Sequence, residues 1–251
     1  MKNKLVVEIG EGLGNQLFKY AFAYSLAKKI NYELLIDDKS GYSRKKNKLR
    51  NHQKYMLNFL NIEQIIAPDK YKYNSFFKRL IKKIEIFIDN FRGKKKFILE
   101  TNKKINGEKI VNYLNFPDEN KLCNKLYVSG YFENEKYFKH FKKDLIKLYK
   151  PLPKFIKSNY EIIEKLKSTN SVSIHIRQHR FSEQPHEKKD NIRMIKSEKF
   201  LKELILYVNK SVIYFEKTLT NPKFFIWSND FINLEKYFDK KNSLMLQEMM
   251  L

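Results

Sequence analysis

The chain has 251 residues, of which 42% are apolar, so it can bury the core of one large domain or two modest ones. Its formal charge of +23 favours an anionic partner, whether nucleic acid, a lipid surface or a phosphorylated small molecule. Its single cysteine, Cys123, excludes a disulfide framework or a thiolate metal site built within one chain.

The distribution of the basic residues does not choose among these partners. They are mostly lysines scattered among Asn and Ile, so a compositional bias accounts for them better than a dedicated polyanion patch. No nucleic-acid motif is recognised, and we expect no nucleic-acid partner. Glu8 interrupts the first apolar run too early for a signal peptide, and no apolar stretch reaches the length of a membrane span. We therefore expect a soluble cytoplasmic protein, with peripheral contact to the inner face of the membrane left open.

The N-terminal segment predicts a strand, a glycine turn and a helix. Residues 5–9 read LVVEI, a β-rich run, and residues 15–29 are rich in helix formers and apolar on nearly every face. Three of the seven glycines, Gly10, Gly12 and Gly14, lie between these runs. Because the spacing G-x-G-x-G is not the full dinucleotide fingerprint, an anion-binding loop and a plain strand-to-helix turn are equally well supported.

Residues 33–37, ELLID, predict a second strand, and a helix follows from Phe76. We expect this surface helix to turn its apolar stripe toward the core; the alternative is a helix that lies on an anionic membrane surface. The apolar positions that recur at helical spacing are Phe77, Leu80, Ile81, Ile84, Ile88 and Phe91.

Residues 125–149 predict a strand that breaks at Gly130 and then an amphipathic helix. Two prolines, Pro151 and Pro153, follow in a short polar stretch that is typical of a linker. We therefore expect an N-terminal α/β domain at 1–150 and a second domain at 151–251.

Strict alternation in residues 172–177 predicts a strand with Ser173, His175 and Arg177 on one face and β-branched residues on the other. His175 and Arg177 then lie about 7 Å apart at the carboxyl end of the strand, where open α/β sheets bind their ligands. The guanidinium fork of Arg177 suits two oxygens of a phosphate or diphosphate. The alternative is a surface ion pair for Arg177 and a satisfied polar tip for His175.

Residues 223–230 predict a second strand that ends in Ser228, Asn229 and Asp230, followed by a helix-like segment. These residue types are typical of a helix N-cap, which gives them a purely structural alternative. They also emerge at the same sheet edge as His175 and Arg177, so the two loops predict a crevice. No zinc-ligand spacing, phosphate-binding P-loop or serine nucleophile elbow occurs in the sequence.

Four segments together resemble the α-1,2-fucosyltransferases of glycosyltransferase family 11. They are EGLGNQLFKYAFAYSLAKK from residue 11, GYFENEKYF from residue 130, VSIHIRQHRF from residue 172 and FFIWSND from residue 224. The resemblance implies a GT-B-like fold of two Rossmann-type domains, with an acceptor side and a donor side. It also implies transfer of fucose from GDP-fucose to the 2-hydroxyl of a galactoside in a surface glycan, with no cofactor and no metal.

The site that the resemblance implies has catalytic roles for Arg177 and His175, and a GDP-sugar contact set. In the family, the second-half motif is His-x-Arg-Arg-x-Asp, so this chain has Gln178 in place of the second Arg and Arg180 in place of the Asp. Relatives also continue beyond the point where this chain stops, so we expect the donor domain to be truncated. The residues expected to contact the donor are Gly12, Gly14, Asn15, Gln16, His175, Arg177, Ser228 and Asp230.

The chemistry needs preorganised donors that stabilise the charge developing on the departing diphosphate, and Arg177 and the loop of residues 12–15 are suitable. The sequence does not single out a base for the acceptor hydroxyl, although Glu11, Asp37 and Asp230 lie in the right regions. Two alternatives stay open. One is a related enzyme with another GDP-sugar or acceptor, and the other is a fold that binds nucleotide sugar or glycan without turnover.

Overall fold

The computed structural model describes residues 2–42, 54–100, 102–105, 108–111, 118–179, 191–238 and 243–246. The chain divides into two compact units, Met1–Leu152 and Pro153–Leu251. The boundary expected after residue 150 lies two residues before this division.

Unit 1 is built on a four-stranded parallel sheet with the order β2-β1-β6-β3. The strands are β1 (Lys4–Glu8), β2 (Glu33–Asp37), β3 (Lys95–Leu99) and β6 (Leu122–Ser129). The two strands expected at 5–9 and 33–37 are confirmed. A separate antiparallel hairpin is formed by β4 (Asn102–Ile105) and β5 (Glu108–Val111). Strand β1 is central, with β2 on one side and β6 on the other. The loop after β1 therefore lies at the topological switch point of the sheet, where open α/β sheets bind ligands.

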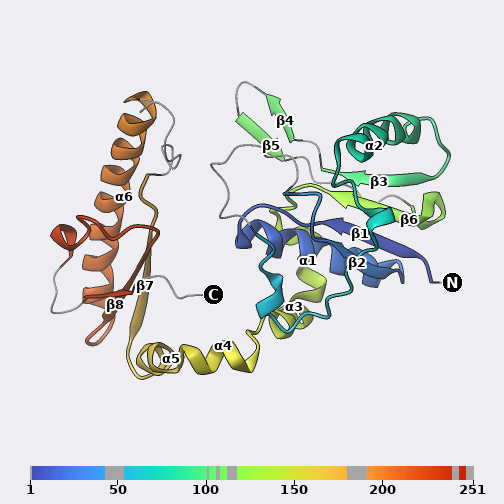
Figure 1. Ribbon diagram of the computed structural model, residues 1–251. Helices are drawn as coiled ribbons and strands as arrows, with labels where there is room; N and C mark the ends of the chain where they lie inside the picture. Colours follow the sequence, from blue (N-terminus) through green and yellow to red (C-terminus); the bar gives the residue numbers. More distant parts are fainter. Residues whose placement is uncertain are drawn as a thin grey trace. The chain divides into compact units, whose positions relative to one another are not determined.

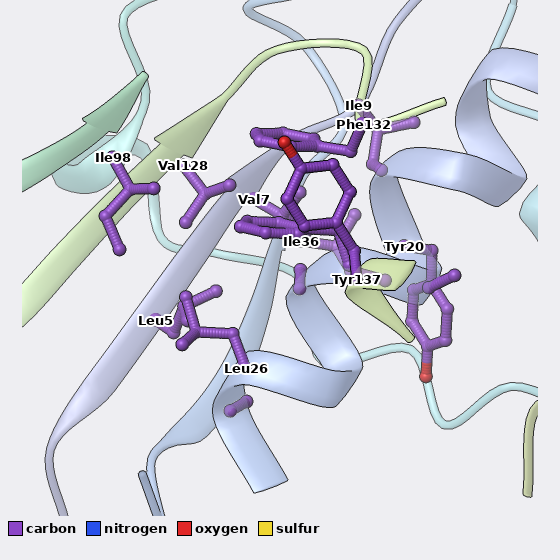
Figure 2. Packing of buried hydrophobic residues seen from close by; sticks show 14 of the residues in the cluster. Leu5, Val7, Ile9, Tyr20, Leu26, Ile36, Ile98, Val128, Phe132 and Tyr137 are labelled. Carbon is purple, nitrogen blue, oxygen red and sulfur yellow. The ribbon is translucent and has the colours of Figure 1, made fainter. Parts of the chain in front are cut away.

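Helix α1 (Leu13–Lys29) covers one face of this sheet and is largely buried. Leu5, Val7 and Ile9 alternate onto that face and pack with Leu26 and Ile36 (Figure 2). Phe22 of α1 stacks on Phe132, with ring centroids 3.8 Å apart. The expectation of a buried helix packed on a sheet is therefore confirmed.

Helix α2 (Phe76–Asp89) lies near β3 on the opposite side of the sheet (Figure 1). The helix was predicted, but the prediction that its apolar stripe faces the core is wrong. Lys82 and Asp89 are its buried residues, whereas the aromatic and aliphatic side chains of the stripe are exposed. The reason is that β1 and β2 end in the buried carboxylates of Glu8 and Asp37 on this side of the sheet, and buried carboxylates require polar partners.

The buried carboxylate of Glu8 forms an ion pair with Lys82, and their Oε2 and Nζ atoms are 2.6 Å apart. The hydroxyl of Tyr127 lies 2.9 Å from Oε2 of Glu8 and 2.7 Å from Oδ2 of Asp37. Burial, and then the charges of these two carboxylates, raise the pKa of Tyr127 far above its usual value, so the phenol stays protonated. Helix α2 is thus attached to the sheet through charges and hydrogen bonds.

The segment after β6 differs from its prediction. Instead of one amphipathic helix, it forms two short 3-10 helices, η5 (Glu135–Tyr137) and η6 (Lys139–Phe141), and then α3 (Lys142–Leu148). The side chain of Asn134 accepts a hydrogen bond from the N–H of Lys136, and Phe138 has φ −136° and ψ 5°, which interrupts a helix. Among the described residues, the other 3-10 helices are η2 (Leu57–Phe59), η3 (Asp69–Tyr71), η4 (Glu119–Lys121) and η7 (Glu235–Tyr237).

Unit 2 has a three-stranded parallel sheet with the order β7-β8-β9. Its strands are β7 (Ser171–Ile176), β8 (Lys223–Ser228) and β9 (Ser243–Leu246), and its helices are α4 (Pro153–Ser158), α5 (Tyr160–Lys167) and α6 (Asn191–Thr218). The long helix α6 runs beside the sheet (Figure 1). Its Ile205 and Val208 belong to one buried cluster with Ile174 and Ile226. In the described part of the chain, no helix has both the length and the apolar character needed to span a membrane.

Removal of the Lys82 amine tests the attachment of α2. We expect Lys82→Ala to lower the free energy of unfolding by about 3 kcal/mol, because Glu8 would keep a buried charge without its cation. The matched control is Lys83→Ala, which removes the exposed neighbouring lysine and should change stability by less than about 0.5 kcal/mol. Urea denaturation measures both values, and equal stabilities of the two variants would contradict the ion-pair attachment.

Candidate functional site

The glycine-rich turn of unit 1 connects β1 to α1, and its glycines have different roles. A Cβ added to Gly10 would lie 2.9 Å from the Cα of Gly41, so Gly10 is required by the close approach of two backbone segments. The left-handed position in the turn is occupied by Glu11, at φ 70°. Gly12 and Gly14 have open space where a Cβ would be. The absence of side chains at these two positions leaves the start of α1 accessible.

The N-terminus of α1 is where the sequence places an anion-binding loop or a plain strand-to-helix turn, and the choice between them stays a prediction. Gly12 is the N-cap and contributes no side chain, and the first turn of the helix contains no acidic residue. The first N–H groups of a helix have no partner within the helix, and the helix dipole adds positive potential there. A phosphate oxygen would therefore be stabilised at this end of α1.

Asn15 and Gln16, both expected to contact the donor, are used differently by the fold. The Asn15 amide donates a hydrogen bond of 2.6 Å to the Glu11 carboxylate, which also accepts one of 3.0 Å from the hydroxyl of Tyr131. The Gln16 side chain is fully buried, and its Nε2 donates to the carbonyls of Glu11 and Lys54 at 2.8 Å each. Gln16 therefore fixes the shape of the turn, and its direct contact with a ligand stays a prediction.

Two residues beside this turn were missed by the sequence reasoning. Lys19 is buried, its Nζ lies 3.5 Å from the carbonyl oxygen of Gly10, and it also lies 5.3 Å from the centre of the Tyr131 ring. A lysine nearly two turns into a buried helix is the available signal, because a buried cation needs a partner nearby. Lys19 adds positive charge behind the turn, and Tyr131 links the loop after β6 to Glu11.

The three carboxylates considered as bases have different surroundings. Asp37 is fully buried and accepts hydrogen bonds from the N–H groups of Lys39 and Ser40 and from Tyr127, so it is closed to an acceptor hydroxyl. Glu11 is partly exposed. Asp230, in unit 2, is also partly exposed.

His175 and Arg177 share the exposed face of β7 and its carboxyl end, as predicted. Ile174 and Ile176 are buried, and His175 and Arg177 are exposed. The His175 ring stacks on Trp227, which is its register partner on β8, with centroids 6.0 Å apart and an angle of 13° between the planes. This aromatic partner was missed by the sequence reasoning, although it follows once β7 and β8 are paired in parallel.

The loops after β7 and β8 meet, which confirms that their polar residues emerge at one sheet edge. The N–H of Gln178 donates to Oδ1 of Asn229 at 2.8 Å, and the Asn229 amide donates back to the Gln178 carbonyl at 3.2 Å. The buried Gln178 side chain donates to the carbonyls of Asp230 and Ile232, at 2.7 and 3.1 Å. Gln178 thus joins the two loops from the inside.

Ser228 and Asp230 stabilise the turn after β8. Ser228 Oγ contacts the carbonyl and the N–H of Asp230, and Oδ1 of Asp230 accepts from the N–H of Ile232 at 2.9 Å. Oδ2 of Asp230 lies 3.2 Å from Nε2 of His179. In the described residues 231–238, the helix-like segment that was predicted is the short 3-10 helix η7, and the Ser and Asp side chains close local loops instead of capping a longer helix. Arg180 lies outside the described residues.

The sequence and the fold both have relatives among known proteins. No family model matches the chain. An alpha-1,2-colitosyltransferase from Escherichia coli is 27% identical over 234 residues, which cover 93% of this chain and 71% of that protein. The fucosyltransferase NodZ from Bradyrhizobium matches in structure with a TM-score of 0.52 at 12% identity, over 99% of this chain and 79% of that chain. Structures of NodZ alpha-1,6-fucosyltransferase co-crystallized with GDP and soaked with GDP-fucose match with TM-scores of 0.52 and 0.51.

The sequence relative supports a glycosyltransferase. The matches to NodZ show a shared fold. The predicted fold class is confirmed, because the α/β chain with its parallel sheets resembles NodZ, a GT-B-like enzyme of the Rossmann type. Membership in family 11 and truncation of the donor domain stay predictions, as do the roles expected for residues 1–150 and 151–251.

Replacement of Gln178 tests whether its side chain joins the loops after β7 and β8. We expect Gln178→Ala to lower the free energy of unfolding by about 2 kcal/mol, because two carbonyls would lose their buried donor. The control is His179→Asn, which removes the exposed ring but keeps a residue type that tolerates the φ of 52° found there, and it should change stability by less than about 0.5 kcal/mol. Chemical denaturation measures both variants, and a neutral Gln178→Ala would show that the loops are joined by other contacts.

Proposed function

We propose that the chain transfers L-fucose from GDP-fucose to the 2-hydroxyl of a galactoside in a surface glycan, with inversion at the sugar carbon. The observation that carries the proposal is the exposed His175 and Arg177 at the carboxyl edge of β7, beside a loop pair that Gln178 and Asn229 hold in place. This edge is where parallel α/β sheets bind ligands. The sequence relative and the fold relatives are all glycosyltransferases by name, which supports the same class of reaction.

Arg177 is the proposed ligand for the diphosphate. Fucosyl transfer breaks the bond between the sugar carbon and the diphosphate oxygen, and the bonding electrons leave as negative charge on GDP. A guanidinium fork can hold two of the resulting oxygens, and this interaction strengthens as the charge develops. Within unit 1, the N–H groups at the start of α1, next to Gly12 and Gly14, are proposed as an anion contact in their own right.

His175 is proposed to contact the donor alongside Arg177. Its stacking on Trp227 fixes the plane of the imidazole, so the ring can present a polar edge to the nucleotide sugar without losing much rotamer freedom on binding. Asn15, Gln16, Ser228 and Asp230 are the other side chains of the proposed contact set, and Gln16 also holds the turn.

The acceptor hydroxyl must lose its proton as it attacks the fucosyl carbon. The burial of Asp37 removes it from the three carboxylates considered for this step. Glu11 and Asp230 remain, both partly exposed and both held by hydrogen bonds, Glu11 from Asn15 and Asp230 from the N–H of Ile232.

We propose that the reaction needs no metal ion and no other cofactor, because a guanidinium and helix N–H groups can stabilise a departing diphosphate. Transfer activity is then expected to be unchanged in EDTA. We also propose that the protein works as a peripheral protein at the inner face of the membrane.

A second donor has its own support, because the curated relative is a colitosyltransferase. Colitose is fucose without its 3-hydroxyl group, so the two sugars differ in one hydrogen-bonding group. A site that binds the 3-hydroxyl through buried polar groups rejects colitose strongly, by roughly 10⁴-fold, whereas an apolar pocket discriminates by only about 10²-fold. Initial rates with both GDP-sugars on one galactoside therefore identify the donor. Binding of GDP-fucose without product from either donor would support the alternative of a fold without turnover.

The role of Arg177 is tested by nucleotide binding. We expect Arg177→Ala to weaken GDP binding by about 10- to 100-fold, because one charge-assisted fork is lost. Lys223→Ala is the control, since it removes a cation at the amino end of β8, the opposite edge of the same sheet, and should leave affinity within about twofold. Titration calorimetry measures both, and unchanged affinity in Arg177→Ala would remove this residue from the donor site.

A further inference from the structure

Helix α2 exposes nearly its whole apolar face. Phe76, Phe77 and Phe87 are 70%, 74% and 64% exposed, and Phe91, just beyond the helix, is 78% exposed. Exposed single apolar residues are ordinary, but a contiguous apolar helix face indicates a binding surface. We call this the α2 face; it also contains Leu80, Ile81, Ile84 and Ile88, all exposed.

The exposure of the α2 face follows from how the helix is attached. At 100° per residue, the apolar positions span an arc of roughly 140°, and the arc opposite contains Lys82, Glu85 and Asp89. Lys82 forms an ion pair with Glu8. Glu85 accepts a hydrogen bond from the hydroxyl of Tyr73 and forms an ion pair with Lys96. Asp89 accepts hydrogen bonds from the backbone N–H groups of Lys96 and Phe97. The apolar arc cannot turn inward without breaking these contacts.

The charge around the α2 face has one sign. Residues 75–96 contain eight basic and two acidic residues. Both acidic residues, Glu85 and Asp89, are engaged on the sheet side together with Lys82 and Lys96, so the exposed charged residues of this segment are basic. Lys83 and Arg92 are exposed next to the apolar residues. The surface that reaches solvent is therefore apolar with a basic margin.

We propose that the α2 face binds an anionic lipid bilayer, with the helix lying in the plane of the interface. The phenylalanine and isoleucine side chains enter the boundary between headgroups and acyl chains, and the basic margin contacts anionic headgroups. The 14 residues of α2 measure about 21 Å, too short to span a bilayer and suitable for lying on one. A second copy of the chain fits less well as the occupant, because two such faces would bring two basic margins together.

This inference does not depend on the donor or acceptor of the proposed reaction. It gives a peripheral location a physical cause in unit 1, and it can fail while glycosyl transfer holds, or hold while glycosyl transfer fails.

Vesicle co-sedimentation tests the inference with the whole chain. We expect binding to vesicles of phosphatidylcholine and phosphatidylglycerol at a ratio of roughly two to one, weaker binding to pure phosphatidylcholine, and weakening at high salt. The double variant Phe77→Gln/Ile84→Gln should reduce partitioning at least about tenfold, because two apolar side chains no longer enter the interface. Both residues are exposed, so the variant is expected to keep its fold, which thermal unfolding checks.

The matched control is Ile192→Gln/Ile195→Gln on α6, which also replaces two exposed apolar side chains on a helix, and it should bind vesicles like the unmodified chain. Equal binding by both double variants would overturn the inference. So would a concentration-dependent dimer that only Phe77→Gln/Ile84→Gln dissolves, combined with no vesicle binding, because the occupant would then be a second copy.

A fluorescent label adds a positional readout. Because Cys123 is the single cysteine, Cys123→Ser permits one label at an introduced Ile84→Cys or at an introduced Ile195→Cys. An environment-sensitive dye is expected to shift to the blue on anionic vesicles at position 84 and not at position 195. A shift at position 195 alone would place the membrane contact on α6 and overturn the assignment to α2.

Discussion

The arrangement of unit 1 depends on one buried ion pair, between Glu8 at the end of β1 and Lys82 of α2. Alternation along β1 turns Val6 and Glu8 toward the α2 side of the sheet while Leu5 and Val7 face α1. A buried carboxylate at the end of a central strand needs a cation, and Lys82 supplies it. The orientation of α2 follows from this requirement, because the face that offers the amine cannot also be the apolar face. An exposed apolar surface is therefore the consequence of satisfying a charge in the interior.

The same strand end also determines the shape of the glycine turn. The close contact between Gly10 and Gly41 restricts the backbone conformation of the turn. The Gln16 side chain donates a hydrogen bond to the carbonyl of Glu11 and so holds that carbonyl in place. The turn is thus shaped by contacts within unit 1 and does not need a ligand to order it. For the anion contact proposed at the start of α1, a preformed loop would lose little conformational entropy on binding.

The sequence predicted those features that depend on local patterns. β1, β2, β7 and β8 follow from apolar runs and alternation, and the exposed face of His175 and Arg177 follows from the same period of two. The orientation of α2 could not be predicted, since its amphipathic pattern is equally compatible with either direction and the deciding partner, Glu8, lies 74 residues away in sequence. The role of Gln178 was hidden for the same reason, because its acceptors on the next strand's loop become neighbours only once β7 and β8 pair. Local periodicity specifies elements, whereas long-range polar contacts specify which face each element presents.

Gln178, which stands where the family motif has its second Arg, has a structural role. An arginine at this buried position would bring a positive charge, and the carbonyls of Asp230 and Ile232 are neutral acceptors that cannot balance it. The neutral amide of Gln178 donates to both carbonyls without needing a counter-charge. Arg177, the residue that follows β7, is exposed and is the cation proposed for the diphosphate. The scattered lysines act differently, since their attraction for anions is long-range, weak and screened by salt. Two kinds of cation thus coexist in the chain, a guanidinium fork just after β7 and a diffuse basic margin around α2. Only the first has the geometry to distinguish one phosphate arrangement from another.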